Sequence, residues 1–434
     1  MRYVSTRGNT PPTSATEALL HGLAPDGGLF FPERIPALDP ATPAPKTTAT
    51  FRESSLPKIA ATMMRPYFEG IGSIDEIAAS ALSFEIPLVE VRPGWHVLEL
   101  FHGPTLAFKD VGARVFARLL GAIGLGAEPL TILVATSGDT GGAVANAFHG
   151  VPGTRVVVMY PEGKVSPLQE RQFTTLGGNV TAVAVRGAFD DCQRLAKAAF
   201  ADRSLRERVR LTSANSISLG RLIPQTIYYA WAWSRLPAGG PAPVVCVPSG
   251  NFGNLAAGLI ARRMGVPIAR FVAATNANDV VPEYLRTGDF RPRPSVSTIS
   301  NAMDVGDPSN LERIEHLYER DLQAIRRDVL ASAHDDAATR DCIRRVDREL
   351  GYLLDPHTAV GWLALEELGE TDAPRVLVST AHPAKFREEV EPVIGRVLDI
   401  PEELAVGLTR ESHAVRIAPR EEELRAVLDE PLRS

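Results

Sequence analysis

Cysteine is scarce in this sequence, with only Cys192, Cys246 and Cys342 spread through 434 residues. Three widely spaced cysteines form neither a disulfide framework nor a zinc-binding pattern, which fits a reducing compartment. The nine histidines include no HExxH sequence and no Cys/His cluster, so we expect no catalytic metal. The acidic residues are scattered as well, and they give no support to a hydrolase that works with two paired carboxylates.

Long hydrophobic runs are also missing. No stretch approaches the roughly 20 apolar residues of a membrane span, and the N-terminal MRYVSTRGNTPPTS lacks the apolar core of a signal peptide. The formal net charge of −6 arises from 46 basic and 52 acidic residues without a basic block, which argues against a nucleic-acid surface. We therefore expect a cytoplasmic protein, bound neither to a membrane nor to nucleic acid, whose partner is a small molecule.

What is present is the composition of a soluble globular protein, with 44% hydrophobic residues in a chain too long for one core. From Trp95 onward, apolar runs alternate with longer helical patterns; the runs are TILVAT, TRVVVMY, VTAVAV, PVVCVP and RFVAAT. Such runs are typical of strands buried on both faces, and alternation with helices predicts a mostly parallel sheet in an α/β fold. Residues 1–90 have few apolar runs and are expected to form an N-terminal appendage, while 311–350 are expected to form solvated amphipathic helices.

Two of these runs end in glycine turns that precede helix starts. The turn SGNFGN, residues 249–254, places several backbone N–H groups near one point, which suits a phosphate. A tight turn needed only for close packing explains this sequence about as well. The turn lacks the Lys-Ser/Thr pair of a nucleotide P-loop.

A second anion site is indicated by the other turn, ATSGDTGG, where Thr136, Ser137, Asp139 and Thr140 lie at the start of a helix. Helix capping alone would also explain these residues. In the segment TSANSISLGR, Asn215, Ser216 and Arg221 could converge on the same anion, although a loop arginine is usually a surface charge.

Lys109 lies in the segment HGPTLAFKD, after the apolar residues Leu106, Ala107 and Phe108. Apolar surroundings lower the pKa of a lysine toward the range in which its amine is a nucleophile, as a Schiff-base lysine requires. For an arbitrary lysine, a solvated side chain paired with the neighbouring Asp110 is the commoner arrangement.

The ordered set of motifs resembles the bacterial threonine synthases, which are pyridoxal-phosphate enzymes of fold type II. The resemblance covers nearly the whole chain, because GLAPDGGLFFPERIP and YPEGKVSPLQERQF also take part. The other motifs in this order are HGPTLAFKD, ATSGDTGGA, TSANSISLGR, VPSGNFGN, AATNANDVVP, STISNAMDVGDPSN and STAHPAKF.

The resemblance implies a role for each candidate residue. Lys109 would bind pyridoxal 5'-phosphate as a Schiff base and move protons. The turn formed by Ser249, Gly250, Asn251, Phe252, Gly253 and Asn254 would hold the cofactor phosphate, and Thr380 would lie near the pyridine nitrogen. Asp139 takes a position near the cofactor's 3-hydroxyl where the wider superfamily usually has asparagine. The substrate phosphate would be held by Ser137, Thr140, Asn215, Ser216 and Arg221, with Lys164 added to the set.

The implied architecture has two α/β domains around a cofactor cleft and a small N-terminal domain. We expect the N-terminal domain at 1–90, the large pyridoxal-phosphate domain at 91–125 and 216–434, and a small mobile domain at 126–215. The implied reaction is that of a carbon–oxygen lyase acting on phosphates: O-phospho-L-homoserine and water give L-threonine and phosphate, as the last step of threonine biosynthesis.

Two rival interpretations remain at this point. One is a related enzyme acting on another phosphorylated amino acid, and the other is a non-catalytic binding protein with the same fold, or a nucleotide binder that uses the glycine turns. The sequence does not distinguish a monomer from a homodimer.

Overall fold

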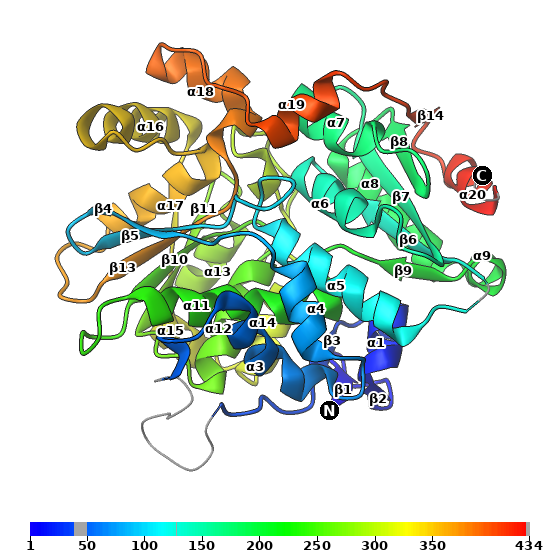
Figure 1. Ribbon diagram of the computed structural model, residues 1–434, viewed down its shortest axis with the longest axis horizontal. Helices are drawn as coiled ribbons and strands as arrows, with labels where there is room; N and C mark the ends of the chain where they lie inside the picture. The colour runs from blue at the N-terminus through cyan, green and yellow to red at the C-terminus, as the bar shows by residue number, and fades with distance from the viewer. Residues whose placement is uncertain (39–49, 127, 431–434) are drawn as a thin grey trace.

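The computed structural model describes residues 1–38, 50–126 and 128–430. These residues form three sheets, of three, six and five strands. In Figure 1 the six-stranded sheet lies on the left, the five-stranded sheet on the right and the N-terminal sheet below them. The chain therefore has two large α/β units side by side, each built on its own sheet, and a small N-terminal sheet.

The N-terminal sheet is antiparallel with the strand order β2-β1-β3. Its strands are β1 (Arg2–Ser5), β2 (Thr13–Ser14) and β3 (Phe30–Pro32), and its helices are α1 (Ala15–His21), α3 (Leu56–Phe68) and α4 (Ile74–Ala81). A capping box begins α1, because Ser14 accepts from the Glu17 N–H while the Glu17 carboxylate accepts from the Ser14 N–H. Helix α3 packs against α11 (Thr226–Arg235), which fixes this segment to the large sheet's helices.

The six-stranded sheet has the order β12-β11-β10-β13-β5-β4, and every neighbouring pair is parallel except β4 with β5. Its strands are β4 (Leu88–Arg92), β5 (Trp95–Glu99), β10 (Val244–Pro248), β11 (Arg270–Thr275), β12 (Val329–Ala333) and β13 (Arg375–Ser379). Alternate residues face opposite cores: Cys246 and Leu377 pack with Trp362 of α17 (Pro356–Glu366), whereas Val245 and Val247 join the core that contains α11 and α12 (Gly253–Met264). Burial on both faces explains the apolar runs of the inner strands β10, β11 and β13.

The five-stranded sheet has the order β14-β8-β7-β6-β9 and is parallel throughout. Its strands are β6 (Leu130–Ala135), β7 (Thr154–Pro161), β8 (Val180–Val185), β9 (Leu211–Ser213) and β14 (Val415–Ile417). Val156 and Val158 pack in the core with Phe148 of α6 (Asp139–Phe148), while Val157 and Val183 pack in the core of α8 (Phe189–Ala201) and α20 (Glu421–Asp429).

The remaining elements connect and cover these sheets. They are α5 (Lys109–Ile123), α7 (Pro167–Thr174), α9 (Arg203–Arg208), α10 (Leu219–Leu222), η1 (Ile223–Gln225), α13 (Val280–Thr287), η2 (Asn301–Met303), α14 (Leu311–Leu317), α15 (Leu322–Asp328), α16 (Asp336–Leu350), η3 (Pro383–Phe386), α18 (Arg387–Ile394) and α19 (Glu402–Leu408).

The fold class and the five apolar strands agree with the sequence prediction. The prediction for 311–350 is wrong at residues 329–333, because β12 forms an edge strand of the large sheet there. Edge strands are covered less completely, so their sequence carries polar residues and gives a weaker signal. The domain boundaries stay a prediction; judged by its sheet, the small domain would also include β14 and α20 from the expected 216–434 portion.

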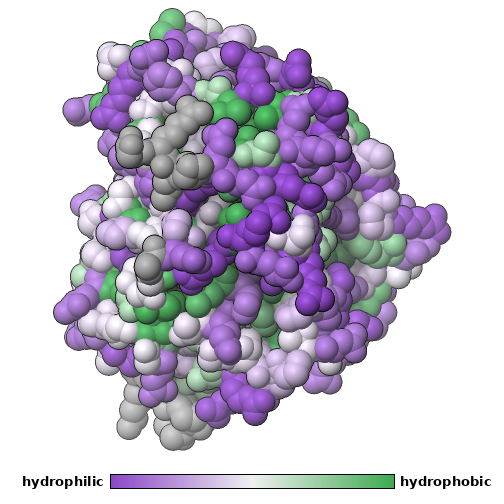
Figure 2. Space-filling view, turned by 90° about the vertical axis from the view of Figure 1, so that its right-hand side faces the viewer, coloured by the Kyte–Doolittle hydropathy of each residue, from purple (hydrophilic) through white to green (hydrophobic). Residues whose placement is uncertain are grey.

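None of the helices in the described part of the chain is both long and apolar enough to cross a membrane. Figure 2 shows a face on which hydrophilic residues predominate and hydrophobic ones form small scattered groups.

Candidate active site

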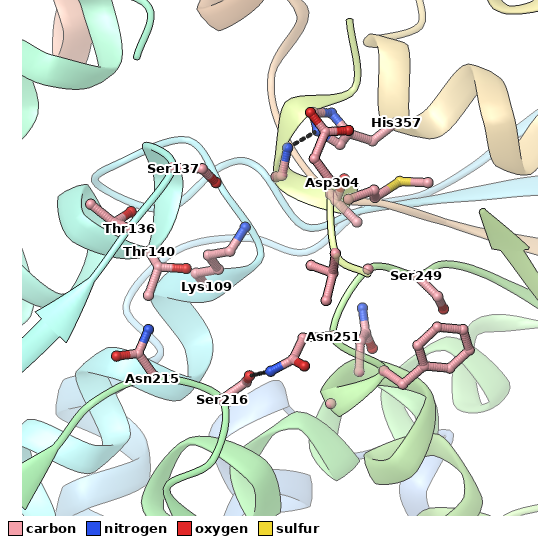
Figure 3. A pocket seen from close by; sticks show the side chains of 18 of the residues that line it. Lys109, Thr136, Ser137, Thr140, Asn215, Ser216, Ser249, Asn251, Asp304 and His357 are labelled. Atoms are coloured by element: carbon pink, nitrogen blue, oxygen red, sulfur yellow. Dashed lines mark hydrogen bonds between the residues drawn. The ribbon is translucent and has the colours of Figure 1, made fainter. Parts of the chain in front are cut away.

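A cavity lies between the two large sheets, at the carboxyl ends of β6, β10 and β13. Open α/β sheets bind ligands at this end, because the loops that follow parallel strands meet there. Figure 3 shows Lys109 reaching into the cavity from one side, with Ser249 and Asn251 on the opposite side. The predicted residues that line it are Lys109, Ser137, Thr140, Asn215, Ser216, Arg221, Ser249, Gly250, Asn251, Phe252, Gly253, Asn254 and Thr380.

Two predicted residues lie outside this lining. Asp139 is buried directly behind it, with Oδ2 at 3.6 Å from the Nζ of Lys109. Lys164 is exposed in the loop before α7 and does not line the cavity. The structure therefore brings together every predicted residue except Lys164.

Lys109 is the first residue of α5, and its backbone is fixed by the end of the large sheet. The Phe108 N–H donates to the Thr380 carbonyl at 2.8 Å, and Leu106 has a left-handed φ of 54°. A left-handed conformation in a bulky residue is uncommon and occurs most often where the surrounding structure enforces it, as at functional sites. The lysine side chain is 12% exposed. Burial lowers the pKa of Lys109, and Lys385 and Arg221 act in the same direction against the attraction of Asp139.

The alternative arrangement, in which a solvated Lys109 pairs with Asp110, does not occur. Asp110 is fully buried, and it accepts from both the N–H and the hydroxyl of Thr105, at 2.9 and 2.6 Å. The carboxylate near Lys109 is Asp139 instead. Its Oδ1 accepts from Gln169 Nε2 and pairs with Lys385 Nζ, each at 2.7 Å. Burial on its own would raise the pKa of Asp139, but the two lysines hold it well below its ordinary value.

The SGNFGN turn joins β10 to α12 and forms a cradle at the start of that helix. Phe252 adopts a left-handed φ of 59°, and a Cβ on Gly250 would lie 2.7 Å from Met303 Cα. This close approach explains the need for glycine at position 250. Asn254 Oδ1 accepts from the hydroxyls of Tyr228 and Tyr229, while its buried Nδ2 has no partner in the described structure. Free first-turn N–H groups and an unpaired amide suit a phosphate.

The residues predicted for the second anion site line the same cavity, and one of them adjoins the cradle, because Asn251 Nδ2 donates to Ser216 Oγ at 2.6 Å (Figure 3). Thr136 Oγ1 accepts from the N–H groups of Gly138 and Gly141, at 2.9 and 2.8 Å, so Thr136 supplies the capping that the sequence left as an alternative. Ser137 and Thr140 remain in the cavity lining. Asn215 is tied to both backbone polar groups of Ala135, at 3.2 and 2.7 Å.

Arg221 is the buried cation of this site. It is 2% exposed, and its Nη1 donates to the Ala214 carbonyl at 2.6 Å, but its buried Nε has no partner in the described structure. Burial lowers the pKa of Arg221 to about 10. A buried guanidinium with a free donor beside a cavity is suited to bind an anion.

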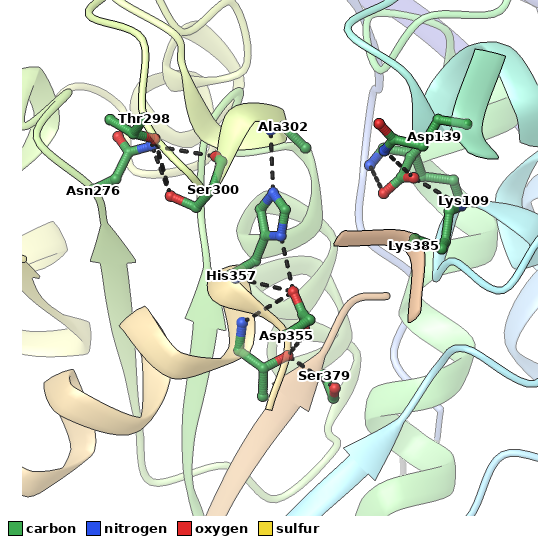
Figure 4. A network of polar contacts seen from close by, with 12 residues as sticks. Lys109, Asp139, Asn276, Thr298, Ser300, Ala302, Asp355, His357, Ser379 and Lys385 are labelled. Carbon is green, nitrogen blue, oxygen red and sulfur yellow. Dashed lines mark hydrogen bonds and ion pairs between the residues drawn. The ribbon is translucent and has the colours of Figure 1, made fainter. Parts of the chain in front are cut away.

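Three functional candidates were missed from the sequence: Asp304, His357 and Lys385. The Ala302 N–H donates to His357 Nε2 at 3.1 Å, so the ring proton lies on Nδ1, which faces Asp355 Oδ1 at 2.8 Å (Figure 4). This arrangement holds the Asn301–Met303 turn against the cavity. Burial raises the pKa of Asp304, another lining residue, to about 6. Asp304 lies within STISNAMDVGDPSN and Lys385 within STAHPAKF, but nothing in these two motifs indicated that Lys385 is buried or that Asp304 is partly buried.

These residues fit the group that the resemblance implies. A buried lysine with a lowered pKa, a phosphate cradle and the hydroxyl of Thr380 line one cavity, as pyridoxal phosphate requires. Within the described ranges, no three His, Cys, Asp or Glu side chains are grouped in a way that could hold a metal ion.

Comparison with known proteins identifies the family. Residues 85–380 match the family "Pyridoxal-phosphate dependent enzyme", residues 2–82 match "Threonine synthase N terminus" and residues 358–428 match "Threonine synthase, C-terminal". The chain is 42% identical to a threonine synthase of Escherichia coli, over 93% of this chain and 94% of that protein. It is 45% identical to a threonine synthase of Haemophilus influenzae, over 90% of each.

Solved structures agree with this result. The threonine synthase structure from Escherichia coli superposes with a TM-score of 0.92 at 40% identity, covering 99% of both chains. A structure described as pyridoxal-phosphate-bound threonine synthase from Brucella melitensis gives a TM-score of 0.91 at 36% identity, over 99% of this chain and 98% of that one. With the lysine, the cradle and the second anion site in one cavity, the chain belongs to the threonine synthase family of pyridoxal-phosphate-dependent enzymes.

Proposed function

We propose that the protein catalyses the threonine synthase reaction, in which O-phospho-L-homoserine and water give L-threonine and phosphate. The observation that carries this proposal is one largely buried lysine in a cavity that is lined by two predicted sets of anion-binding residues. One set suits the phosphate of a cofactor, and the other suits a phosphate that the substrate loses. A binding protein would have no need of the lysine beside them.

Pyridoxal phosphate, when bound, supplies an electron sink for charge that develops on the substrate. We assign its phosphate to the Ser249–Asn254 turn, its reactive aldehyde to Lys109 and its pyridine nitrogen to Thr380. The unpaired Nδ2 of Asn254 supports the first assignment. A neutral hydroxyl such as that of Thr380 would leave the pyridine nitrogen largely unprotonated.

Lys109 would act as the base that removes the proton from the substrate's α-carbon. Its lowered pKa, caused first by burial, enlarges the fraction of neutral amine that can take a proton. Loss of a β-proton then expels the γ-phosphate, and water adds at the β-carbon.

The leaving phosphate would be held by Ser137, Thr140, Asn215, Ser216 and Arg221. Donors already in position stabilise the charge that develops on the phosphate without reorganisation of solvent. Among them, Arg221 supplies the free, buried Nε that supports this assignment.

Phosphate release from O-phospho-L-homoserine tests the proposal directly. The wild type reconstituted with pyridoxal phosphate should release phosphate and form threonine, and Lys109→Ala should lose both activities. The exposed Lys197 on α8 gives the matched control, because Lys197→Ala should keep them. Arg221→Met should raise KM by about 10- to 100-fold, since a hydrogen bond to a charged group contributes roughly 1.5–3 kcal/mol.

A wild type that releases no phosphate from this substrate would refute the proposal. Release from a different phosphorylated amino acid would instead assign a related activity in the same family.

We also propose that the protein acts in the cytoplasm as a monomer or homodimer. Its three cysteines are free and buried, which suits a reducing compartment. Light scattering on the purified protein measures the oligomeric state.

A further inference from the structure

Asp139 is shared by two lysines from different parts of the chain, the fully buried Lys385 and the largely buried Lys109. Its Oδ1 pairs with Lys385 Nζ and accepts a hydrogen bond from Gln169 Nε2, each at 2.7 Å, and its Oδ2 lies 3.6 Å from Lys109 Nζ (Figure 4). Asp139 begins α6, Lys385 lies in η3 and Lys109 begins α5. The two donors on Oδ1 fix the carboxylate so that its other oxygen faces Lys109.

Lys385 has no exposed surface and is held firmly in this place. Its Nζ also donates to the Thr105 carbonyl at 2.7 Å, and its own carbonyl accepts from Ser166 Oγ at 3.1 Å. Moving an ammonium group out of water costs several kcal/mol unless it is well paired. Because it is fully buried, Lys385 needs the Asp139 carboxylate as its ion-pair partner. The catalytic candidate Lys109 therefore has to share the same carboxylate with Lys385.

We propose that Lys385 is a positioning residue for the reaction. Lys385 orients Asp139 toward Lys109 and neutralises part of the carboxylate's negative charge, so Asp139 does not hold Lys109 as a fully paired ammonium. This inference rests on the proposed function of Lys109. Asp139 then keeps the amine in place without stabilising its protonated form too strongly.

The other charged groups around Lys109 agree with this arrangement. Lys385 from η3 and Arg221 from α10 repel a proton on Lys109, and Asp139 is the carboxylate that attracts it. The Phe108 ring, 4.7 Å from Nζ, forms an apolar side of the same space. With Lys385 absent, Asp139 would be free to pair with Lys109 alone.

The test measures how readily the Lys109 amine loses its proton in the full-length chain before cofactor is added. Cyanate reacts only with neutral amines, so the labelling rate of the Lys109 peptide, followed by mass spectrometry across pH, reports the apparent pKa of Lys109. The exposed Lys58 and Lys197 serve as internal references in every sample.

Lys385→Met should raise this pKa and lower the labelling of Lys109 at pH 7 by about tenfold, since one pKa unit changes the neutral fraction tenfold. Asp139→Asn should change labelling in the opposite direction. A residue that only supports the fold would not produce opposite shifts. If Lys385→Met does not fold, Lys385→Gln replaces it: the neutral amide keeps a donor for the Asp139 carboxylate but carries no charge, so labelling of Lys109 should again fall.

Labelling of Lys109 that is unchanged or faster without Lys385, in a folded protein, would overturn the inference. Thermal unfolding of each variant establishes that it is folded. Because no turnover is measured, this result is independent of whether O-phospho-L-homoserine is the substrate.

Discussion

Arg313→Met should destabilise the protein and loosen its second anion site. Arg313 is fully buried on α14, and its guanidinium donates to the carbonyls of Phe30, Ser216 and Ile217 at 2.6–3.2 Å and to Asn310 Oδ1 at 2.7 Å. It therefore joins the N-terminal sheet to the 215–218 loop. Methionine has a similar length but offers no donor.

The magnitude follows from the carbonyls left without a partner. The buried carbonyl of Phe30 and the partly buried carbonyls of Ser216 and Ile217 would each lose a donor, at roughly 1–3 kcal/mol apiece. Part of this loss is recovered, because burial lowers the pKa of Arg313 to about 9 and a buried cation is itself unfavourable. The net loss expected in the free energy of unfolding is about 2–4 kcal/mol.

The assay is urea unfolding of the wild type and variant, compared at the first transition because the chain has more than one domain. Inorganic phosphate should also protect the variant less, since Ser216 and Ile217 lose their backbone anchor. Arg7→Met is the matched control, because Arg7 pairs with Glu312, the residue before Arg313, at 3.3 Å. The Arg7 side chain is 51% exposed, so loss of this ion pair should cost under about 1 kcal/mol. If Arg313→Met were as mild as Arg7→Met, the reasoning would be refuted.

Three further predictions concern separate parts of the molecule. Gly250→Ala should destabilise the protein by about 1–3 kcal/mol and weaken pyridoxal-phosphate retention measured by absorbance, because the new Cβ would lie 2.7 Å from the Met303 backbone; Gly240→Ala, whose Cβ would meet nothing closer than 3.9 Å, should do neither. Burial raises the pKa of Asp304 to about 6, so the folded state binds this proton more tightly than the unfolded state. The contribution of Asp304 to stability therefore rises as pH falls from about 6 toward 4, and melting curves of Asp304→Asn should lack this gain; parallel curves for both proteins would contradict the assignment. Arg155→Met should loosen the attachment of α20, because Arg155 donates to two carbonyls at the end of that helix and to the Glu430 carbonyl just after it, at 2.6–3.0 Å; limited proteolysis should then cut the C-terminal segment faster, and an unchanged cleavage rate would count against this role.

The sequence by itself determined the α/β class, the central strands and most of the candidate site. Strands such as β6 and β10 are buried on both faces, so their apolar runs are evident without knowledge of their neighbours. The glycine turns after them were recognisable because loops that follow parallel strands meet at one edge of the sheet. Lys109 was identified by its apolar neighbours and by the ordered motifs around it.

Only the tertiary structure decided which charges lie together. Lys385 and Asp139 are far apart in the chain, and the residues next to Lys385 do not show that it is buried while Lys164 is exposed. The edge strands β12 and β14 escaped detection for a related reason, since their pairing depends on partners elsewhere in the sequence. Local sequence determines what each segment can form, whereas burial and charge pairing arise only when distant segments pack against one another.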